Sequence, residues 1–241
     1  MRLRVRLKYK IDAPLPVPVA FRWDLVRPLE FYSGPMNGQA RRQQLVRDLM
    51  RAVAFDEVVE TGTYRGVTST FLSNVSGLPV HTAEMSARFF RYSRVRCADD
   101  PAITVHHSDS RRLLRELADR DGDPTLFFYL DAHWQEDVPR YEELEIIHRR
   151  WSRAVVVIDD FRVNDDPGYG HETYHGVPLD PDYLPQLPGW RRYYPAARSF
   201  EETGMRRGCL ILASPALTGV VDELGGLRPA GPVMAPAQTT A

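Results

Sequence analysis

Residues 58–68 read Val-Val-Glu-Thr-Gly-Thr-Tyr-Arg-Gly-Val-Thr, an apolar run that ends in an acid and is followed by two glycines spaced Gly-x-x-x-Gly. This pattern predicts a buried strand over residues 55–59 that turns sharply into a helix. Gly62 would let the chain turn at positive φ or leave room for a ligand, and Gly66 would let the helix pack tightly. Tyr64 excludes the dinucleotide fingerprint. The stretch therefore predicts either a nucleoside-like ligand without a diphosphate or a plain turn without a ligand.

Length and composition indicate one globular domain. The chain has 241 residues, 43% of them hydrophobic and 26% charged, and a formal charge of −1, which argues against a nucleic-acid partner. Cys97 and Cys209 have neither disulfide nor metal spacing, so we expect packed thiols in a reducing cytoplasm. The first ten residues alternate basic and apolar side chains, and no run is long enough to span a membrane. Lys8 and Lys10 are the only lysines, which excludes a lysine base in the core.

The chain divides into three parts. Residues 1–35 predict an N-terminal edge strand over 2–9 and a connector that is broken by the prolines at 14, 16 and 18. Residues 36–224 predict the main domain, which opens with a helix over 40–53. The Gly-, Pro- and Ala-rich tail from residue 225 to 241 is expected to be disordered.

The main domain predicts an α/β fold with a doubly wound, mostly parallel sheet and helices on both of its faces. Strand-like runs centred near residues 59, 80, 105, 128 and 156 alternate with amphipathic stretches. Residues 127–130 and 154–158 are continuous apolar runs, typical of central strands. After Phe161 the alternation stops for about twenty residues, a length that suits a lid. Residues 190–194 and 207–213 predict a closing antiparallel hairpin at the sheet edge.

Acids follow nearly every predicted strand, where a doubly wound sheet binds its ligands. Glu84 lies about twenty residues after the glycine turn, a place from which a carboxylate can accept both hydroxyl hydrogens of a ribose. Its alternative role is to lie beside a helix N-cap. Ser108-Asp109 could receive an adenine amino group, or Asp109 could cap the next helix.

Asp131, Asp159 and Asp160 follow two neighbouring strands. Three carboxylates placed so closely would repel one another and lose ionisation unless a cation held them, and oxygen ligands favour Mg²⁺ over zinc. The sequence therefore predicts a divalent metal site. In the alternative, Asp131 caps a helix and the other two acids open the following loop.

His133 is our preferred general base, because it follows a proposed ligand and imidazole titrates near neutrality. His171 and His175 in the expected lid are its rivals, whereas His106 and His107 are expected to be structural. Residues 171–175 match the zinc motif His-Glu-x-x-His. Flanking glycines and nearby prolines nevertheless make the helix that the motif requires improbable.

Glu60-x-Gly62-x-x-x-Gly66, Glu84 and Asp109 together resemble the class I S-adenosylmethionine-dependent methyltransferases, over about residues 36–213. The resemblance implies a seven-stranded sheet with a reversed last strand. It also implies a set of residues that bind S-adenosylmethionine: Glu60, Gly62, Thr63, Tyr64, Gly66, Glu84, Ser108 and Asp109.

Residues 129–134 and 157–160 further resemble the metal-dependent O-methyltransferases of the catechol and macrocin types. Residues 36–39, Met-Asn-Gly-Gln, resemble a substrate-side loop of the catechol branch. By this similarity Asp131, Asp159 and Asp160 would hold Mg²⁺ or a similar ion. Two departures stand out: Asp160 replaces an expected Asn, and Trp134 replaces an expected lysine base.

We therefore expect a cytoplasmic O-methyltransferase that transfers the methyl group of S-adenosylmethionine to a hydroxyl of a small molecule, such as a sugar, polyol or aromatic compound of a tailoring pathway. A divalent cation is expected to bind that hydroxyl and lower its pKa. Neither nucleic acid nor membrane is expected as a partner, and the sequence leaves open whether the chain forms a homo-oligomer. Two alternatives stay open: a metal-assisted hydrolase that uses the same acids, and a non-catalytic nucleoside-binding module.

Overall fold

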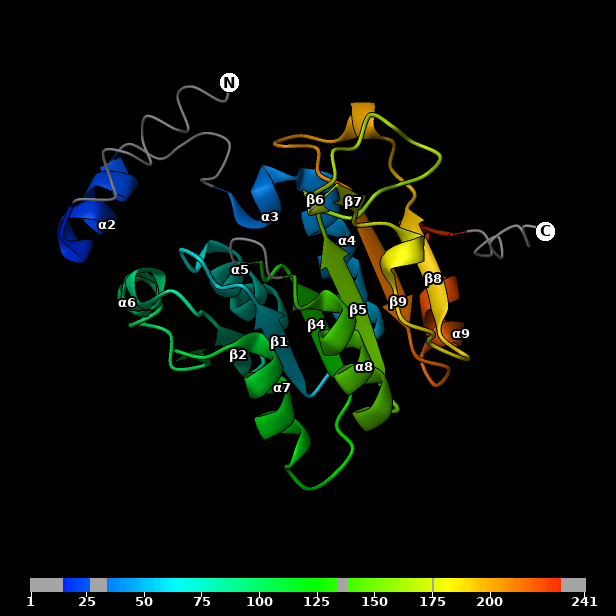
Figure 1. Cartoon of the computed structure of the whole chain (residues 1–241), viewed down its shortest axis with the longest axis horizontal. Helices are drawn as coiled ribbons and strands as arrows, with labels where there is room; N and C mark the ends of the chain where they lie inside the picture. Colours follow the sequence, from blue (N-terminus) through cyan, green and yellow to red (C-terminus); the bar gives the residue numbers. More distant parts are fainter. Residues whose placement is uncertain (1–14, 27–33, 134–137, 175, 231–241) are drawn as a thin grey trace.

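The computed structural model describes residues 15–26, 34–133, 138–174 and 176–230. Within them the central sheet has eight strands in the order β10-β8-β9-β5-β4-β1-β2-β3 (Figure 1). The strands are β1 Glu57–Thr61, β2 Val80–Ala83, β3 Ile103–His106, β4 Leu126–Leu130, β5 Ala154–Asp159, β8 Arg191–Pro195, β9 Cys209–Ala213 and β10 Leu227–Pro229. A separate ribbon pairs β6 Thr173–Tyr174 with β7 Val177–Pro178.

The five strands β1 to β5 are parallel, as the alternating pattern predicted. Strand β1 lies between β2 and β4, so that Val59 faces His81 on one side and Phe128 on the other. Strands β4 and β5 are buried along their whole length, which explains their uninterrupted apolar runs. The strand order reverses between β1 and β4, and such a reversal opens a ligand-binding crevice at the carboxyl ends of the strands.

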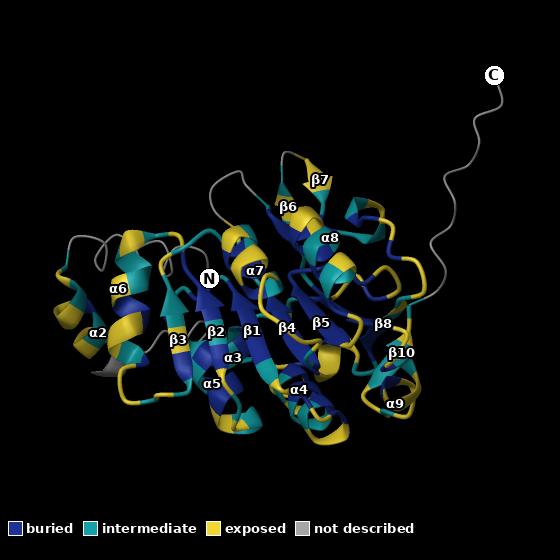
Figure 2. Ribbon diagram, turned by 90° about the horizontal axis from the view of Figure 1, so that it is seen from below, coloured by how far each residue is buried: buried dark blue, intermediate teal, exposed yellow. Residues whose placement is uncertain are grey.

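Helices cover both faces of the sheet (Figure 2). Their bounds are α4 Ala40–Ala52, α5 Val67–Ser76, α6 Ala87–Arg96, α7 Ser110–Ala118, α8 Arg140–Arg150 and α9 Thr218–Asp222. Apolar side chains of α7 and α8 pack on one face, with Val59, Phe128 and Val156. Those of α4, α5 and α9 pack on the other, with Val58 and Phe127. The predicted doubly wound architecture is confirmed.

The closing hairpin is antiparallel, as predicted, with Arg191 opposite Ala213. Its place in the sheet differs from the prediction, because β9 inserts between β5 and β8 and a further strand, β10, forms the edge. Strand β10 begins the stretch that was expected to be a disordered tail. It forms because Leu227 pairs with Pro195 and packs on the core beside α4 and α9. The remainder of that tail, 231–241, lies outside the described residues.

The N-terminal part also differs from the prediction. The expected strand over 2–9 lies outside the described residues, and the expected connector contains helix α2, Val17–Val26. Prolines are compatible with this helix because Pro16 precedes it and Pro18 lies in its first turn, where a missing N–H costs no helical bond. Helix α2 lies beside α6 (Figure 1), with the rings of Phe21 and Tyr92 edge to face at 5.6 Å.

Shorter elements complete the chain: α3 Pro35–Gly38 and the 3-10 turns η1 Pro181–Tyr183 and η2 Ser199–Glu201. No helix in the described ranges is long and apolar enough to cross a membrane.

Candidate active site

The turn between β1 and α5 has the predicted left-handed backbone. Gly62 has φ +88° and Gly66, the N-cap of α5, has φ +74°. A Cβ on Gly62 would lie 2.7 Å from the backbone carbonyl carbon of Asp131, so the space beside this glycine is occupied by the chain leaving β4. Tyr64 also has positive φ, at 48°. The turn thus requires glycine at position 62 for chain packing, whether or not a ligand lies above it.

Glu84, directly after β2, is hydrogen-bonded to the backbone of this turn. Its Oε2 accepts the backbone N–H of Tyr64 at 2.7 Å and its Oε1 accepts that of Ser86 at 2.8 Å. Burial raises the pKa of this carboxyl above its usual range, although the two backbone bonds oppose the shift. A carboxylate has about four acceptor sites, so two remain for other donors such as ribose hydroxyls. The N-cap neighbour and ribose-binding roles are therefore compatible.

Glu60 lies beneath the turn, at 1% exposure. Its Oε2 accepts the hydroxyls of Ser69 and Thr82, and Thr82 in turn lies 2.6 Å from the hydroxyl of Thr63. Burial raises the pKa of Glu60 to about 7. These contacts tie β1 to α5 and β2, so Glu60 supports the turn from below.

Asp109 has the capping role that the sequence left open. It is the N-cap of α7 and accepts the backbone N–H of Arg111 at 2.9 Å, while its Oδ2 pairs with the Arg111 guanidinium at 2.7 Å. These bonds to Arg111 lower the pKa of Asp109. The Ser108 hydroxyl donates to the carbonyl of Asp109 at 3.0 Å. Adenine binding by Ser108 and Asp109 stays a prediction.

The three acids expected to bind a metal each face an arginine instead. Arg42 pairs with Asp159, Arg207 Nε lies 2.5 Å from Asp160 Oδ1, and Arg140 Nη2 lies 3.7 Å from Asp131 Oδ1. The arginines come from α4, from the residues before β9 and from α8. Their charges supply the cationic compensation that the argument from repulsion assigned to a metal ion.

Asp159 is hydrogen-bonded on both of its oxygens. Oδ1 accepts from Arg42 and from the backbone N–H of Asp160, and Oδ2 accepts from the Tyr129 hydroxyl at 2.7 Å and from Asn37 at 3.2 Å. Burial alone would raise the pKa of Asp159, but Arg42 and these hydrogen bonds hold it below its usual range. Four donors account for the acceptor sites of a carboxylate, which leaves none for a metal.

The metal expectation is therefore not supported. Among the described residues no group of three or more His, Cys, Asp or Glu side chains is arranged to hold an ion. Asp160 and Asp131 keep raised pKa values, because burial and the charge of Asp159 disfavour their ionisation.

His133 lies two residues after Asp131, just past the end of β4, and the centroid of its ring is 6.2 Å from that of Tyr174 in β6. Partial desolvation and the charge of Arg140 lower the pKa of His133, so the ring is neutral and able to accept a proton near pH 7. Residue 175, one of its rivals, and Trp134 lie outside the described residues. Residues 173–174 form strand β6, which confirms that the His-Glu-x-x-His motif is not on a zinc-binding helix.

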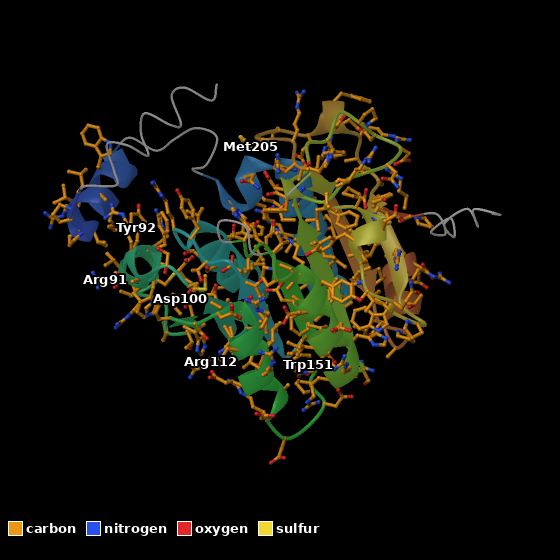
Figure 3. The ribbon with its side chains drawn as sticks, in the orientation of Figure 1. Arg91, Tyr92, Asp100, Arg112, Trp151 and Met205 are labelled. Carbon is orange, nitrogen blue, oxygen red and sulfur yellow. The ribbon has the colours of Figure 1, made fainter. Side chains whose placement is uncertain are left out.

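Residues of the loop after Phe161 and of the segment 36–42 contact the end of β5. Glu172 pairs with Arg207, and its backbone N–H donates to the Asp160 carbonyl at 2.9 Å. Gln39 exchanges two hydrogen bonds with the backbone of Arg207. Met205, labelled beside α3 in Figure 3, donates its backbone N–H to Asn37 at 3.1 Å.

Sequence reasoning missed the arginines, although two of them left a signal. Arg42 shares the buried face of α4 with Leu45, Val46 and Leu49, at the spacing of an apolar stripe. Arg140 begins a similar buried face on α8. A charged residue within such a stripe indicates a buried partner.

No protein-family model matches the chain, and no curated protein sequence matches it. Solved structures match in fold. The O-methyltransferase TomG from Streptomyces achromogenes, involved in tomaymycin synthesis and solved with S-adenosylmethionine, aligns with TM-score 0.54 and 17% identity over 87% of this chain and 96% of its own. An O-methyltransferase from Bacillus cereus, in complex with S-adenosylhomocysteine, aligns with TM-score 0.52 and 15% identity over 86% and 96%. The cofactor-bound protein Rv0187 from MTB aligns with TM-score 0.57 and 16% identity over 88% and 96%.

The chain thus has the fold of the class I S-adenosylmethionine-dependent methyltransferases, as the resemblance implied. The eight strands of the sheet in the described residues include the expected reversed strand, β9, and add β10 at the edge.

Proposed function

We propose that this protein is an S-adenosylmethionine-dependent O-methyltransferase that acts on a hydroxyl of a small molecule. Glu84 is the observation that carries the proposal. It lies at the end of β2, beside the switch in strand order, and is held by the amides of Tyr64 and Ser86 with acceptor sites to spare. Structural neighbours that were solved with S-adenosylmethionine or S-adenosylhomocysteine support the choice of cofactor.

The residues of the turn fit a nucleoside. Glu84 would accept the ribose hydroxyls above the turn formed by Gly62, Thr63 and Tyr64, with Gly66 and Glu60 supporting that turn from below. When bound, the cofactor supplies an activated methyl group. Ser108 and Asp109 would lie near the adenine of the cofactor, and Asp109 also caps α7.

The acceptor would lie over the ends of β4 and β5. His133 would take the proton of the acceptor hydroxyl on a ring nitrogen, since its lowered pKa keeps the ring neutral. Tyr174, near His133, suits the ring of a sugar, polyol or aromatic acceptor from a tailoring pathway. The hydroxyls of Tyr169 and Tyr183 are instead bonded to the carbonyls of Ala197 and Val138.

The metal-assisted hydrolase loses its main support, because it needs the acids free to bind an ion and they are paired with arginines. A non-catalytic nucleoside-binding module would bind the same cofactor without turning it over. Transfer to a hydroxylated acceptor therefore separates the proposal from this alternative.

The cofactor site is tested by calorimetry with S-adenosylhomocysteine. Glu84→Ala should weaken binding by about 1.5–3 kcal/mol, because a charged acceptor is lost from the ribose. Glu116→Ala, an exposed acid on α7, is the matched control and should bind normally. Undiminished binding by Glu84→Ala would remove this residue from the site and contradict the proposal.

The role of His133 as the general base is tested with a mass-spectrometric screen that detects methylated products of hydroxylated acceptors. His133→Ala should lose roughly 10²–10⁴ in turnover, the usual contribution of a general base, and should keep its affinity for S-adenosylhomocysteine. A variant with full turnover would move the base to His171 or His175.

A further inference from the structure

Helix α4 holds Arg42 in a fixed position at the ends of β4 and β5, the part of the sheet edge that we call the acceptor edge. The carboxylate of Glu202 accepts the backbone N–H groups of Arg41 at 3.0 Å and of Arg42 at 3.1 Å, at the start of the helix. The side chain is 2% exposed, and its guanidinium donates both to Asp159 and to the carbonyl of Arg207. Its position is therefore set by bonds at both the backbone and the side chain.

Arg42 and Asp159 neutralise each other inside the protein. A guanidinium keeps its charge even when buried, because burial lowers its pKa but the charge of Asp159 raises it well above the usual value. A divalent ion on Asp159 would have to displace Arg42 from Oδ1 or stand beside its fixed positive charge. Either arrangement is unfavourable where both side chains are buried.

The other two acids provide no substitute site. Arg207 donates to Asp160 and also to Glu172, so one guanidinium links the end of β5 to the loop that follows Phe161. Arg140 is fully buried, donates to the carbonyl of Ala132 at 3.2 Å and lies beside Asp131. Each acid at this edge therefore has a positive charge of the chain next to it.

We propose that Arg42 takes the place of the divalent cation at this edge, so that the protein excludes the ion and transfers methyl groups without it. This inference rests on the proposed function for the transfer itself, but the exclusion of metal is a property of the chain alone. Proton removal then falls to a side-chain base acting on a hydroxyl that no metal activates.

Titration with Mn²⁺, followed by the electron paramagnetic resonance signal of the free ion, tests the exclusion directly. The wild-type protein should leave the added Mn²⁺ free, with or without S-adenosylhomocysteine. Arg42→Gln, which removes the charge, should bind Mn²⁺ at least about tenfold more tightly, because the nearest positive charge is gone. Arg42→Lys keeps a charge and should still exclude the ion. Arg51→Ala, at an exposed arginine of the same helix, should behave as wild type.

Stoichiometric Mn²⁺ binding by the wild type that is lost in Asp159→Asn would overturn the proposal. So would a folded Arg42→Gln that gains no affinity for Mn²⁺. Should Arg42→Gln fail to fold, the wild-type titration and transfer in EDTA decide alone: undiminished transfer supports the proposal, and a loss that Mg²⁺ restores overturns it. Failure of the wild type to bind S-adenosylhomocysteine would contradict the proposed function and leave the Mn²⁺ result standing.

Discussion

The two halves of the carboxyl edge hold their acids in different ways. At the ends of β1 and β2, Glu60 and Glu84 accept hydrogen bonds from hydroxyls and backbone N–H groups. At the ends of β4 and β5, the three aspartates face three arginines. Acids with raised pKa values occur in both halves, but neutral donors suffice where the acids are few, whereas the clustered aspartates also have positive charges beside them.

This contrast shows that an acidic cluster does not by itself indicate a metal. Repulsion among the aspartates requires a positive charge beside them, but a buried guanidinium meets this requirement as well as a metal ion does. Removing a single hydrogen-bond donor should therefore lower the stability of the protein by very different amounts in the two halves of the carboxyl edge.

Removing Arg42 should have the largest effect. Arg42→Met leaves Asp159 buried without its counter-charge and should lower the free energy of unfolding by about 3–5 kcal/mol. Ser69→Ala, which removes one neutral donor from Glu60 on the other edge, should cost about 1 kcal/mol. Urea unfolding measures both variants. Equal losses would mean that the two edges do not differ as described, and partial recovery in Arg42→Met/Asp159→Asn would attribute the loss to charge.

Gly62 lies where the two halves of the carboxyl edge meet, because a Cβ added to it would lie 2.7 Å from the backbone of Asp131. Gly62→Ala should cost about 2–4 kcal/mol, from strain at positive φ plus a clash with backbone that cannot move easily. Gly77→Ala is the matched control: its φ is +65°, but nothing lies within 4 Å of the added methyl, so only about 1–2 kcal/mol is expected. Thermal unfolding compares them. A similar cost for both would show that the close approach to Asp131 has no consequence.

The raised pKa of Glu60, at the end of β1, should make the stability of the protein depend on pH. The pKa of Glu60 is raised from 4.5 to about 7, so the folded state retains a proton that the unfolded state releases. Stability from this group is present below pH 4.5 and is lost as pH rises towards 7, by roughly 1 kcal/mol per pH unit.

Glu60→Gln should accordingly flatten the decline in unfolding free energy measured by urea between pH 5 and 7. Glu143, whose pKa burial also raises to about 7, should leave a residual slope. The exposed Glu116→Gln should keep the full decline. An unchanged slope in Glu60→Gln would mean that Glu60 is ionised in the folded protein across this range.

The sequence predicted the strands well because their signals are local. Apolar runs at 127–130 and 154–158 are confirmed as the fully buried β4 and β5, and the glycine turn has the expected backbone. Strand β10 was missed because three residues in a Gly- and Pro-rich stretch carry no period, and only pairing with β8 defines them.

The arginine pairs could not be predicted because their partners are distant in the chain. Arg42 and Asp159 are 117 residues apart, and no spacing rule connects them. The signal that was present, a charge within the apolar stripe of Leu45, Val46 and Leu49, indicates a buried partner without naming it. The position of Glu84 directly after β2 was predictable because the local strand-turn-helix pattern sets it, whereas its role in binding a ribose stays a prediction.

The pair of hydrogen bonds between Gln39 and the backbone of Arg207 limits the order in which the two halves of the site can fold. Its two hydrogen bonds join residues 168 apart, whereas the bond between Tyr64 and Glu84 joins residues 20 apart. During synthesis the nucleoside turn can acquire its native contacts once Asp131 has emerged, because the turn packs against the backbone of that residue, but the acceptor edge must wait until residue 207 has emerged. Closing so large a loop also costs more chain entropy. The cofactor side of the site can therefore be complete while the acceptor side is still open.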